Sequence, residues 1–213
     1  MLLPDSRYGR TLRYVLGTYE LELHPVIERI IATGLRTIIN GGAAQGYYAV
    51  GFALRCPTAR VVAFEAVIAL HQAIALAAQA NGVGDRVAIR GWCDADSLRD
   101  CLASASTPIL VVADLEGHET NLFHAEMAAG LSQATVLIET HDFLVPGTTD
   151  QLLDRFAATH CVAVYTPRDR TRDDLPPALS SRPWRVLGPL LVWLTREYRP
   201  SSQRWLLFTP RVG

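Results

Sequence analysis

A glycine-rich turn between a short β-branched run and a helical pattern constrains this chain more than any other stretch. The run Thr37-Ile38-Ile39 is typical of a buried strand, and residues 40–48, which follow it, contain three glycines. Glycine lets a backbone turn tightly and approach a ligand closely. A strand, a glycine loop and a helix in this order predict a nucleotide-binding unit.

An acidic residue ends the next predicted strand. Residues 46–55 are expected to form a helix, and residues 60–65 a strand whose last residue is Glu65. A carboxylate at that position lies beside the glycine loop, where it can accept hydrogen bonds from both hydroxyls of a ribose. The glycine loop and Glu65 together predict an adenosine-type ligand.

Strands and helices continue to alternate along the chain. Further strands are predicted at residues 86–90, 107–114, 134–139, 161–165 and 205–209. Helices are expected at about 25–33, 67–80, 94–103, 119–130 and 148–159, the last with a capping box that starts at Thr148. The pattern predicts an α/β fold with a doubly wound, mostly parallel seven-stranded sheet, in which ligands bind beyond the carboxyl ends of the strands.

Length and composition favour a single domain. The chain has 213 residues and is 49% hydrophobic, which is enough for a sizeable core. We expect residues 1–36 to form a helical lead-in and residues 37–165 to form the cofactor-binding core. Residues 166–213 are expected to form an arginine- and proline-rich insertion that ends in a closing strand.

Charge and composition exclude several functional classes. The net charge of −1 provides no basic field for nucleic acid or an anionic membrane. All twenty basic residues are arginine, which excludes a phosphate-loop lysine and a Schiff-base lysine. No apolar run reaches the ~18 residues of a membrane span, and the first residues lack a signal-peptide pattern. We therefore expect a cytoplasmic protein with neither nucleic acid nor membrane as a partner.

Four motifs in order resemble the FkbM-type branch of the class I S-adenosylmethionine-dependent methyltransferases. They are Gly17-Thr18-Tyr19-Glu20, the glycine loop with Tyr47-Tyr48, the segment Asp114-Leu115-Glu116-Gly117-His118-Glu119, and Ile138-Glu139-Thr140-His141-Asp142. The resemblance implies a Rossmann-like methyltransferase fold of bacterial-type biosynthesis, with S-adenosylmethionine as cofactor and S-adenosylhomocysteine as product. A nicotinamide or flavin is the alternative ligand, but the spacing departs from GxGxxG.

The resemblance also implies which residues hold the cofactor. The glycine loop would wrap the methionine end, Glu65 the ribose, and Cys93 and Asp94 the adenine. The expected cofactor-binding residues are Asn40, Gly41, Gly42, Ala43, Gln45, Gly46, Glu65, Ala66, Cys93, Asp94 and Asp114. Asn40 and Gln45 stand where related sequences commonly carry acidic residues, and they keep hydrogen-bonding capacity while losing charge.

Catalysis is expected from Asp114, Glu139 and His141. His141 is the candidate general base, because an imidazole titrates near neutral pH. Asp142 together with Asp114 and Glu139 would suit Mg²⁺, which prefers oxygen ligands. The metal-free interpretation is favoured, and no residue is assigned as a metal ligand.

These observations predict a methyltransferase that acts on an oxygen of a small molecule or sugar-like metabolite, with a homodimer as one option for its assembly. Two alternatives stay open. The first is a non-methylating, cofactor-binding protein on the same fold. The second is an enzyme that uses S-adenosylmethionine for other chemistry, such as cyclisation.

Overall fold

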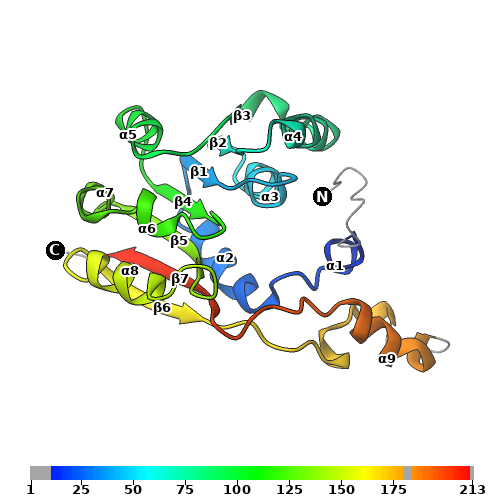
Figure 1. Ribbon diagram of the computed structural model, residues 1–213. Coiled ribbons are helices and arrows are strands. Elements are labelled where there is room, and N and C mark those ends of the chain that lie inside the picture. The colour runs from blue at the N-terminus through cyan, green and yellow to red at the C-terminus, as the bar shows by residue number, and fades with distance from the viewer. Residues whose placement is uncertain (1–10, 180–183, 212–213) are drawn as a thin grey trace.

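The computed structural model describes residues 11–179 and 184–211, and these contain a seven-stranded sheet with the order β3-β2-β1-β4-β5-β7-β6 (Figure 1). The strands are β1 (Thr37–Gly41), β2 (Arg60–Phe64), β3 (Val87–Arg90), β4 (Ile109–Ala113), β5 (Ala134–His141), β6 (His160–Tyr165) and β7 (Gln203–Pro210). Strands β1 to β5 are parallel, whereas β7 runs antiparallel to both β5 and β6. The predicted doubly wound, mostly parallel sheet is therefore confirmed.

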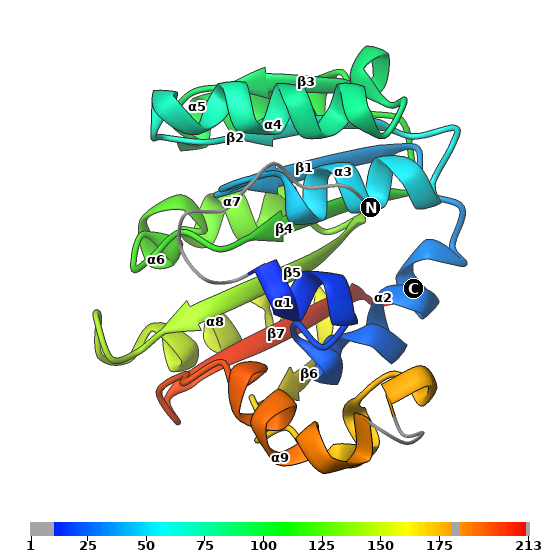
Figure 2. The ribbon, with the colours of Figure 1, turned by 90° about the vertical axis from the view of Figure 1, so that its right-hand side faces the viewer.

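Helices cover both faces of the sheet (Figures 1 and 2). The helices are α1 (Thr11–Leu16), α2 (His24–Ile31), α3 (Tyr47–Arg55), α4 (Ile68–Ala80), α5 (Ala95–Ala103), α6 (Glu119–Leu122), α7 (Ala125–Gly130), α8 (Thr148–Phe156) and α9 (Trp184–Leu194). Helices α2, α3 and α4 lie on one face, and α5 to α8 lie on the other. Short 3₁₀ turns occur at Leu21–Leu23, Gly84–Arg86, Arg172–Asp174 and Pro177–Leu179.

Alternating side chains of the strands supply the two core layers. In β1, Ile38 packs toward α2, α3 and α4, whereas the next residue, Ile39, packs toward α5 to α8. In β4, Leu110 belongs to the first layer and Val111 to the second. Because successive strand residues point to opposite faces, an uninterrupted apolar run fills both layers at once.

Two predicted helix features are wrong. The expected helix over 119–130 is broken at Phe123, whose φ of −93° and ψ of 52° are not helical, so that α7 starts anew after His124. The expected capping box at Thr148 does not form. Gly147 is the residue that precedes α8, with φ +83°, and the Thr148 hydroxyl donates to the carbonyl of Val145 at 2.7 Å.

The C-terminal segment leaves the sheet and returns to it. Helix α9, which contains Pro189, lies beyond the β6 edge, and the chain then re-enters between β5 and β6 as β7 (Figure 2). Residues 1–10 of the expected lead-in, and 180–183 and 212–213 of the expected insertion, lie outside the described part of the chain. Within the described ranges, no helix has the length and apolar character that crossing a bilayer requires.

The strand order places a crevice at the carboxyl end of β1. Strand β1 is flanked by β2 on one side and by β4 on the other, so the connections from β1 and from β3 leave in opposite directions. Ligands of open α/β sheets bind at such a switch point. The glycine loop, which follows β1, lies at this crevice.

Candidate functional site

The glycine loop is held by the carboxylate of Glu65. One oxygen of Glu65 accepts a hydrogen bond from the backbone N–H of Ala44 at 2.7 Å, and the other accepts from Val67 N–H at 2.8 Å. Glu65 is only 7% exposed. Because a carboxylate oxygen has two lone pairs, each keeps capacity for a second donor. Glu65 thus organises the loop and retains the acceptors that a ribose would need.

Gly42 brings the loop into direct contact with the end of β4. A Cβ built on Gly42 would lie 1.8 Å from the carbonyl oxygen of Asp114, and the φ of Gly42 is +73°. The N–H of Asp114 donates to the carbonyl of Gly41 at 3.0 Å. Only glycine permits this approach, so the loop and Asp114 form one unit.

The other predicted cofactor residues lie around this unit. A Cβ built on Gly41 would lie 3.6 Å from the sulfur of Cys93, which places Cys93 beside the loop. Asp94 precedes α5 and accepts a hydrogen bond from Ser97 N–H at 2.8 Å, so it also caps that helix. Ala66, two residues after the end of β2, is exposed, and Gln45 is half-buried.

Asn40 provides a test of whether a methionine-type ligand fits. Asn40 is 1% exposed, and its Oδ1 has no hydrogen-bond partner among the described residues. A buried acceptor without a donor at the base of a nucleotide-type loop suits the ammonium group of an amino-acid ligand. The residues present therefore fit S-adenosylmethionine.

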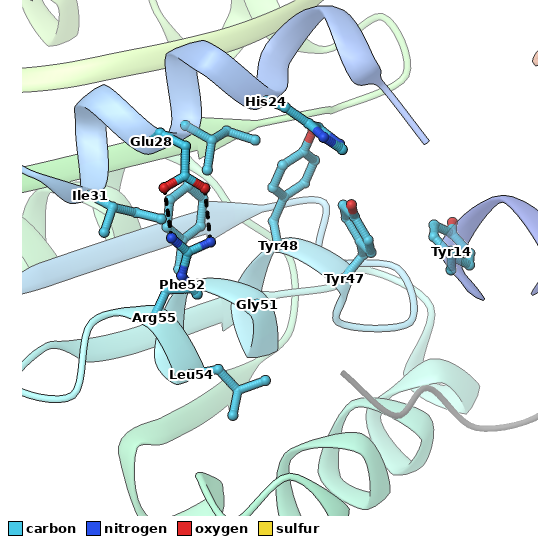
Figure 3. Close-up of a pocket in the computed structure, with 11 residues that line it drawn as sticks. Tyr14, His24, Glu28, Ile31, Tyr47, Tyr48, Gly51, Phe52, Leu54 and Arg55 are labelled. Atoms are coloured by element: carbon cyan, nitrogen blue, oxygen red, sulfur yellow. Dashed lines mark hydrogen bonds and ion pairs between the residues drawn. The ribbon is translucent and has the colours of Figure 1, made fainter. Parts of the chain in front are cut away.

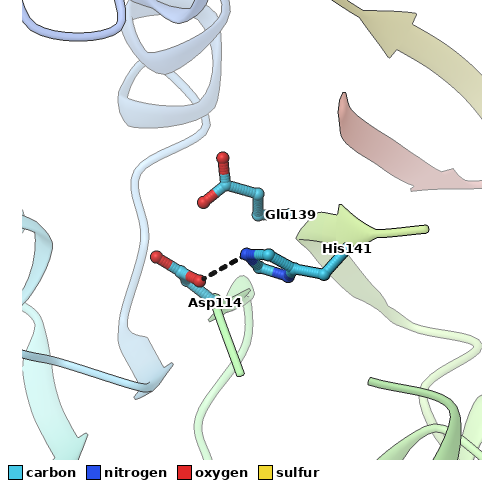
Figure 4. A group of neighbouring side chains, drawn as sticks. All are labelled: Asp114, Glu139 and His141. Carbon is cyan, nitrogen blue, oxygen red and sulfur yellow. Dashed lines mark ion pairs between the residues drawn. The ribbon is translucent and has the colours of Figure 1, made fainter. Parts of the chain in front are cut away.

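Three predicted catalytic residues converge at the ends of β4 and β5 (Figure 4). Ala113 pairs with Ile138 in the sheet, so Asp114 and Glu139 each lie one residue further along their strands. His141 is two residues beyond Glu139 and projects from the same side of β5. The ligand-type atoms of Asp114, Glu139 and His141 lie within 4.8 Å of one another. We call these three residues the acceptor-side triad.

A second buried carboxylate orients His141. Nδ1 of His141 lies 2.6 Å from Oε1 of Glu119, which also accepts from Gly117 N–H at 3.1 Å. The other ring nitrogen, Nε2, lies 3.5 Å from Oδ1 of Asp114. Burial lowers the pKa of His141, but the hydrogen bond to Glu119 and the neighbouring carboxylates outweigh it, and the net shift is upward.

Asp142 does not join the triad. Its carboxylate accepts hydrogen bonds from the backbone N–H of Thr149 at 3.2 Å and from the Thr149 hydroxyl. Asp142 therefore serves the start of α8, where the N–H groups of the first turn need acceptors. In the structure His141, and not Asp142, lies beside Asp114 and Glu139.

An arginine of the C-terminal segment, with a side chain that is 10% exposed, closes the acceptor side. Arg199 donates to the carboxylates of Glu20 and Glu139, and to Glu197 at 2.9 Å. Burial raises the pKa of Glu20 to about 7, although Arg199 opposes the shift. Burial also raises the pKa of Glu139 well above its usual value, and the nearby charge of Asp114 raises it further. The single positive charge of Arg199 thus offsets only part of the negative charge of the carboxylates around it.

The sequence prediction assigned no role to Glu119 or Arg199. Glu119 ended the acidic segment that carried the family resemblance, so a signal for it was present. Arg199 had no such signal, because it lies 60 positions from Glu139 in a segment without a recognised motif. Tyr48, whose hydroxyl donates to Glu20, belongs to the glycine-loop motif, which predicts no separate role for it.

A cavity next to this site does not contain the triad (Figure 3). It has a volume of about 310 Å³, lies between α2 and α3, and includes Tyr47 and Tyr48 in its lining. The carboxylate of Glu28 pairs with Arg55 across it at 2.7 Å. Apolar and aromatic side chains dominate the rest of the lining, so this cavity offers little for proton transfer.

Comparison with known proteins identifies the fold. No protein-family model and no curated protein matches the sequence. An O-methyltransferase from Bacillus cereus, solved in complex with S-adenosylhomocysteine, is 14% identical, with a TM-score of 0.55 over 99% of this chain and 94% of that one. A putative O-methyltransferase from Klebsiella pneumoniae is 12% identical, with a TM-score of 0.56 over 98% and 92%. A precorrin-6y C5,15-methyltransferase from Geobacter metallireducens is 14% identical, with a TM-score of 0.52 over 88% of each chain.

These similarities establish the Rossmann-like fold of the class I S-adenosylmethionine-dependent methyltransferases. At 12–14% identity they concern the fold alone. They contain nothing specific to the FkbM-type branch, so membership of that branch stays a prediction.

Proposed function

We propose that this chain is an S-adenosylmethionine-dependent methyltransferase that methylates an oxygen of a small molecule. The observation that carries the proposal is the contact between Gly42 and the backbone of Asp114. That contact joins a nucleotide-type loop to the first residue of the acceptor-side triad. Bound S-adenosylmethionine would supply an electrophilic methyl group on its sulfonium sulfur.

The residues around the glycine loop would hold the methyl donor. Glu65 keeps free acceptor capacity for the ribose, and Asn40 Oδ1 has an unused lone pair for the ammonium group. Cys93 and Asp94 would flank the adenine. Asn40 and Gln45 contribute hydrogen bonds without charge, so electrostatic attraction of the ammonium group falls to the loop carbonyls and to Asp114.

The triad would align the acceptor. In an oxygen methylation the C–S bond breaks with its electron pair staying on sulfur, a C–O bond forms, and the acceptor hydroxyl loses its proton. Alignment of the two reacting atoms can account for ~7–11 kcal/mol of barrier lowering. Asp114 and Glu139 would position the hydroxyl, and His141 would promote loss of its proton. An imidazole does so either by accepting the proton or by binding an ion that acidifies the hydroxyl.

Calorimetry with S-adenosylhomocysteine tests the cofactor part of this proposal. We expect saturable binding, with affinity lost when the glycine loop is altered. Absence of binding at millimolar ligand would overturn the proposal and favour the non-methylating protein on the same fold. Product analysis of the protein with S-adenosylmethionine alone addresses the second alternative, because intramolecular chemistry would consume the cofactor without any acceptor.

A further inference from the structure

We propose that Asp114, Glu139 and His141 form a binding site for one divalent first-row transition-metal ion. The ion would use Nε2 of His141 and one carboxylate oxygen from each acidic residue. Asp114 directly follows β4, and the other two ligands belong to the neighbouring parallel strand β5, so the sheet brings all three together at its carboxyl end (Figure 4). This set replaces the oxygen-only magnesium set considered from the sequence.

Two facing buried atoms without hydrogen-bond partners are the main support. Nε2 of His141 and Oδ1 of Asp114 lie 3.5 Å apart, and neither has a hydrogen-bond partner among the described residues. His141 is 1% exposed, so water cannot readily satisfy its nitrogen. A deprotonated imidazole nitrogen and a carboxylate oxygen are both acceptors, and a shared cation satisfies both.

The arrangement behind His141 is the one that metal-binding histidines usually have. A ligating imidazole commonly donates its other N–H to a carboxylate, which fixes the ring and its tautomer. Glu119 does this at Nδ1, at 2.6 Å, and is itself fully buried and fixed by the Gly117 N–H. The Glu119 carboxylate therefore leaves Nε2 of His141 as the nitrogen that faces Asp114 and the ion.

The spacing of the ligand atoms suits a small divalent ion. Nitrogen and oxygen ligands bind such ions at ~2.0–2.2 Å, so two ligands of one ion lie at most ~4.4 Å apart. The triad atoms lie within 4.8 Å of one another, and a few tenths of an ångström of side-chain movement closes the difference. An imidazole ligand favours Mn²⁺, Fe²⁺, Co²⁺ or Zn²⁺ over Mg²⁺, which prefers oxygen ligands alone.

The negative charge around the triad also favours binding of a cation. Glu139 Oε1 accepts from Arg199 and from Gln203 Nε2 at 2.8 Å, but a carboxylate has two oxygens and about four acceptor positions. Glu116 adds a further carboxylate 3.6 Å from His141 Nε2. Arg199 is shared with Glu20 and Glu197, so it does not neutralise the triad.

The role of the ion in the reaction rests on the proposed function, whereas the site itself does not. Within that function the ion would bind the acceptor hydroxyl and lower its pKa. The proton would then leave to water, to which the 75% exposed side chain of Glu116 gives access beside the triad. His141 would act as a ligand instead of accepting the proton directly.

Titration of the metal-free protein with Co²⁺, Mn²⁺ and Mg²⁺ tests the site without cofactor or acceptor. We expect one equivalent of Co²⁺ to bind, at least 10-fold more tightly than Mg²⁺. The pulsed electron paramagnetic resonance spectrum of bound Mn²⁺ should show coupling to one ¹⁴N nucleus. Because methyl transfer is not measured, failure here is distinct from failure to bind S-adenosylhomocysteine.

Variants identify the ligands. His141→Ala should remove the ¹⁴N coupling and weaken Co²⁺ binding at least 10-fold, and Glu119→Gln should weaken it 10- to 100-fold. The control His118→Ala changes an exposed histidine of the same segment and should have no effect. If His141→Ala does not fold, Asp114→Asn replaces it. The side chain of Asp114 is 30% exposed, and this variant should weaken binding while keeping the ¹⁴N coupling.

The competing interpretation is an imidazolium ion of His141 paired with Asp114 and Glu116. In that case ¹⁵N spectra would show both ring nitrogens of His141 protonated, and addition of Co²⁺ would not change them. Any one of three results would overturn the proposal. They are that spectrum, no binding of Co²⁺ at millimolar concentration, and equal affinity for Co²⁺ in wild type and Asp114→Asn.

Discussion

The buried carboxylate of Glu119 lies 2.6 Å from Nδ1 of His141 and fixes which ring nitrogen faces Asp114. Glu119 is on α6 and His141 is at the end of β5, so the pair joins two elements behind the acceptor side. The position of α6 relative to β5 therefore determines how the imidazole of His141 is oriented. It also makes Glu119 a positioning residue that can be altered without touching any reacting atom.

Substitution Glu119→Gln should lower the pKa of His141. The hydrogen bond to Glu119 raises that pKa against the effect of burial, so weakening the hydrogen bond leaves burial to lower it. NMR titration of the His141 ring measures the shift directly. If His141 accepts a proton, the acidic limb of the pH–rate profile should move to lower pH in the variant. An unchanged titration curve would show that Glu119 does not control the imidazole.

His141→Ala should slow turnover at least ~10-fold. It removes either a general base, which contributes ~10²–10⁴-fold, or the nitrogen ligand of the ion that acidifies the acceptor hydroxyl. The affinity for S-adenosylhomocysteine should change little, since His141 lies on the acceptor side of the crevice. Steady-state kinetics and calorimetry separate the two effects. His118→Ala is the matched control, and a variant of His141 with normal turnover would remove this residue from the mechanism.

Gly42→Ala should disrupt the site far more than Gly34→Ala. Both glycines have positive φ, +73° and +75°, so alanine at either position costs about 1–2 kcal/mol of backbone strain. At Gly34 nothing lies within 4 Å of the added Cβ, whereas at Gly42 the carbonyl oxygen of Asp114 lies 1.8 Å away. Chemical denaturation should therefore show a larger loss of unfolding free energy for Gly42→Ala. Equal losses in the two variants would contradict the close approach.

Glu65→Ala should weaken binding of S-adenosylhomocysteine at least ~10-fold, which corresponds to about 1.4 kcal/mol. The substitution removes the proposed acceptor for the ribose and frees the backbone N–H of Ala44 that holds the loop. Calorimetry provides the measurement, with the exposed Asp85→Ala as the control. Unchanged affinity would mean that Glu65 neither shapes the loop nor contacts the ligand.

Arg199→Met should destabilise the protein more at pH 8 than at pH 5. Burial raises the folded-state pKa of Glu20 from 4.5 to about 7. Such a carboxyl group contributes its full stability at pH values below its pKa in the unfolded chain. That contribution is lost as the pH rises through its pKa in the folded protein. Removing the buried cation raises the folded pKa further, and an uncompensated buried charge costs about 3–5 kcal/mol.

Thermal and chemical unfolding at the two pH values measures this difference. The exposed Arg196→Met serves as the control, because it removes one arginine of the same segment without altering a buried pair. A loss of stability in Arg199→Met that does not depend on pH would show that packing, and not charge, dominates at this position.

Local patterns predicted much of the fold. The β-branched runs predicted all seven strands, and the run Thr37-Ile38-Ile39 lies within β1, Thr37–Gly41. Apolar continuity marks a strand buried on both faces, and this signal lies within a few neighbouring residues. The helix over 119–130 failed because the break at Phe123 comes from tertiary packing. Phe123 is fully buried, with its ring centroid 6.1 Å from that of Phe156.

The sequence by itself therefore determined the glycine loop, Glu65, and the polar residues at the ends of β4 and β5, because each depends on residues close together in the chain. Only the tertiary structure decided which of these residues meet. It directed Asp142 to α8 and His141 to Asp114, and it brought Arg199 to Glu139 from 60 positions away. Such contacts depend on the path of the whole chain and on the exclusion of water, which no local pattern encodes.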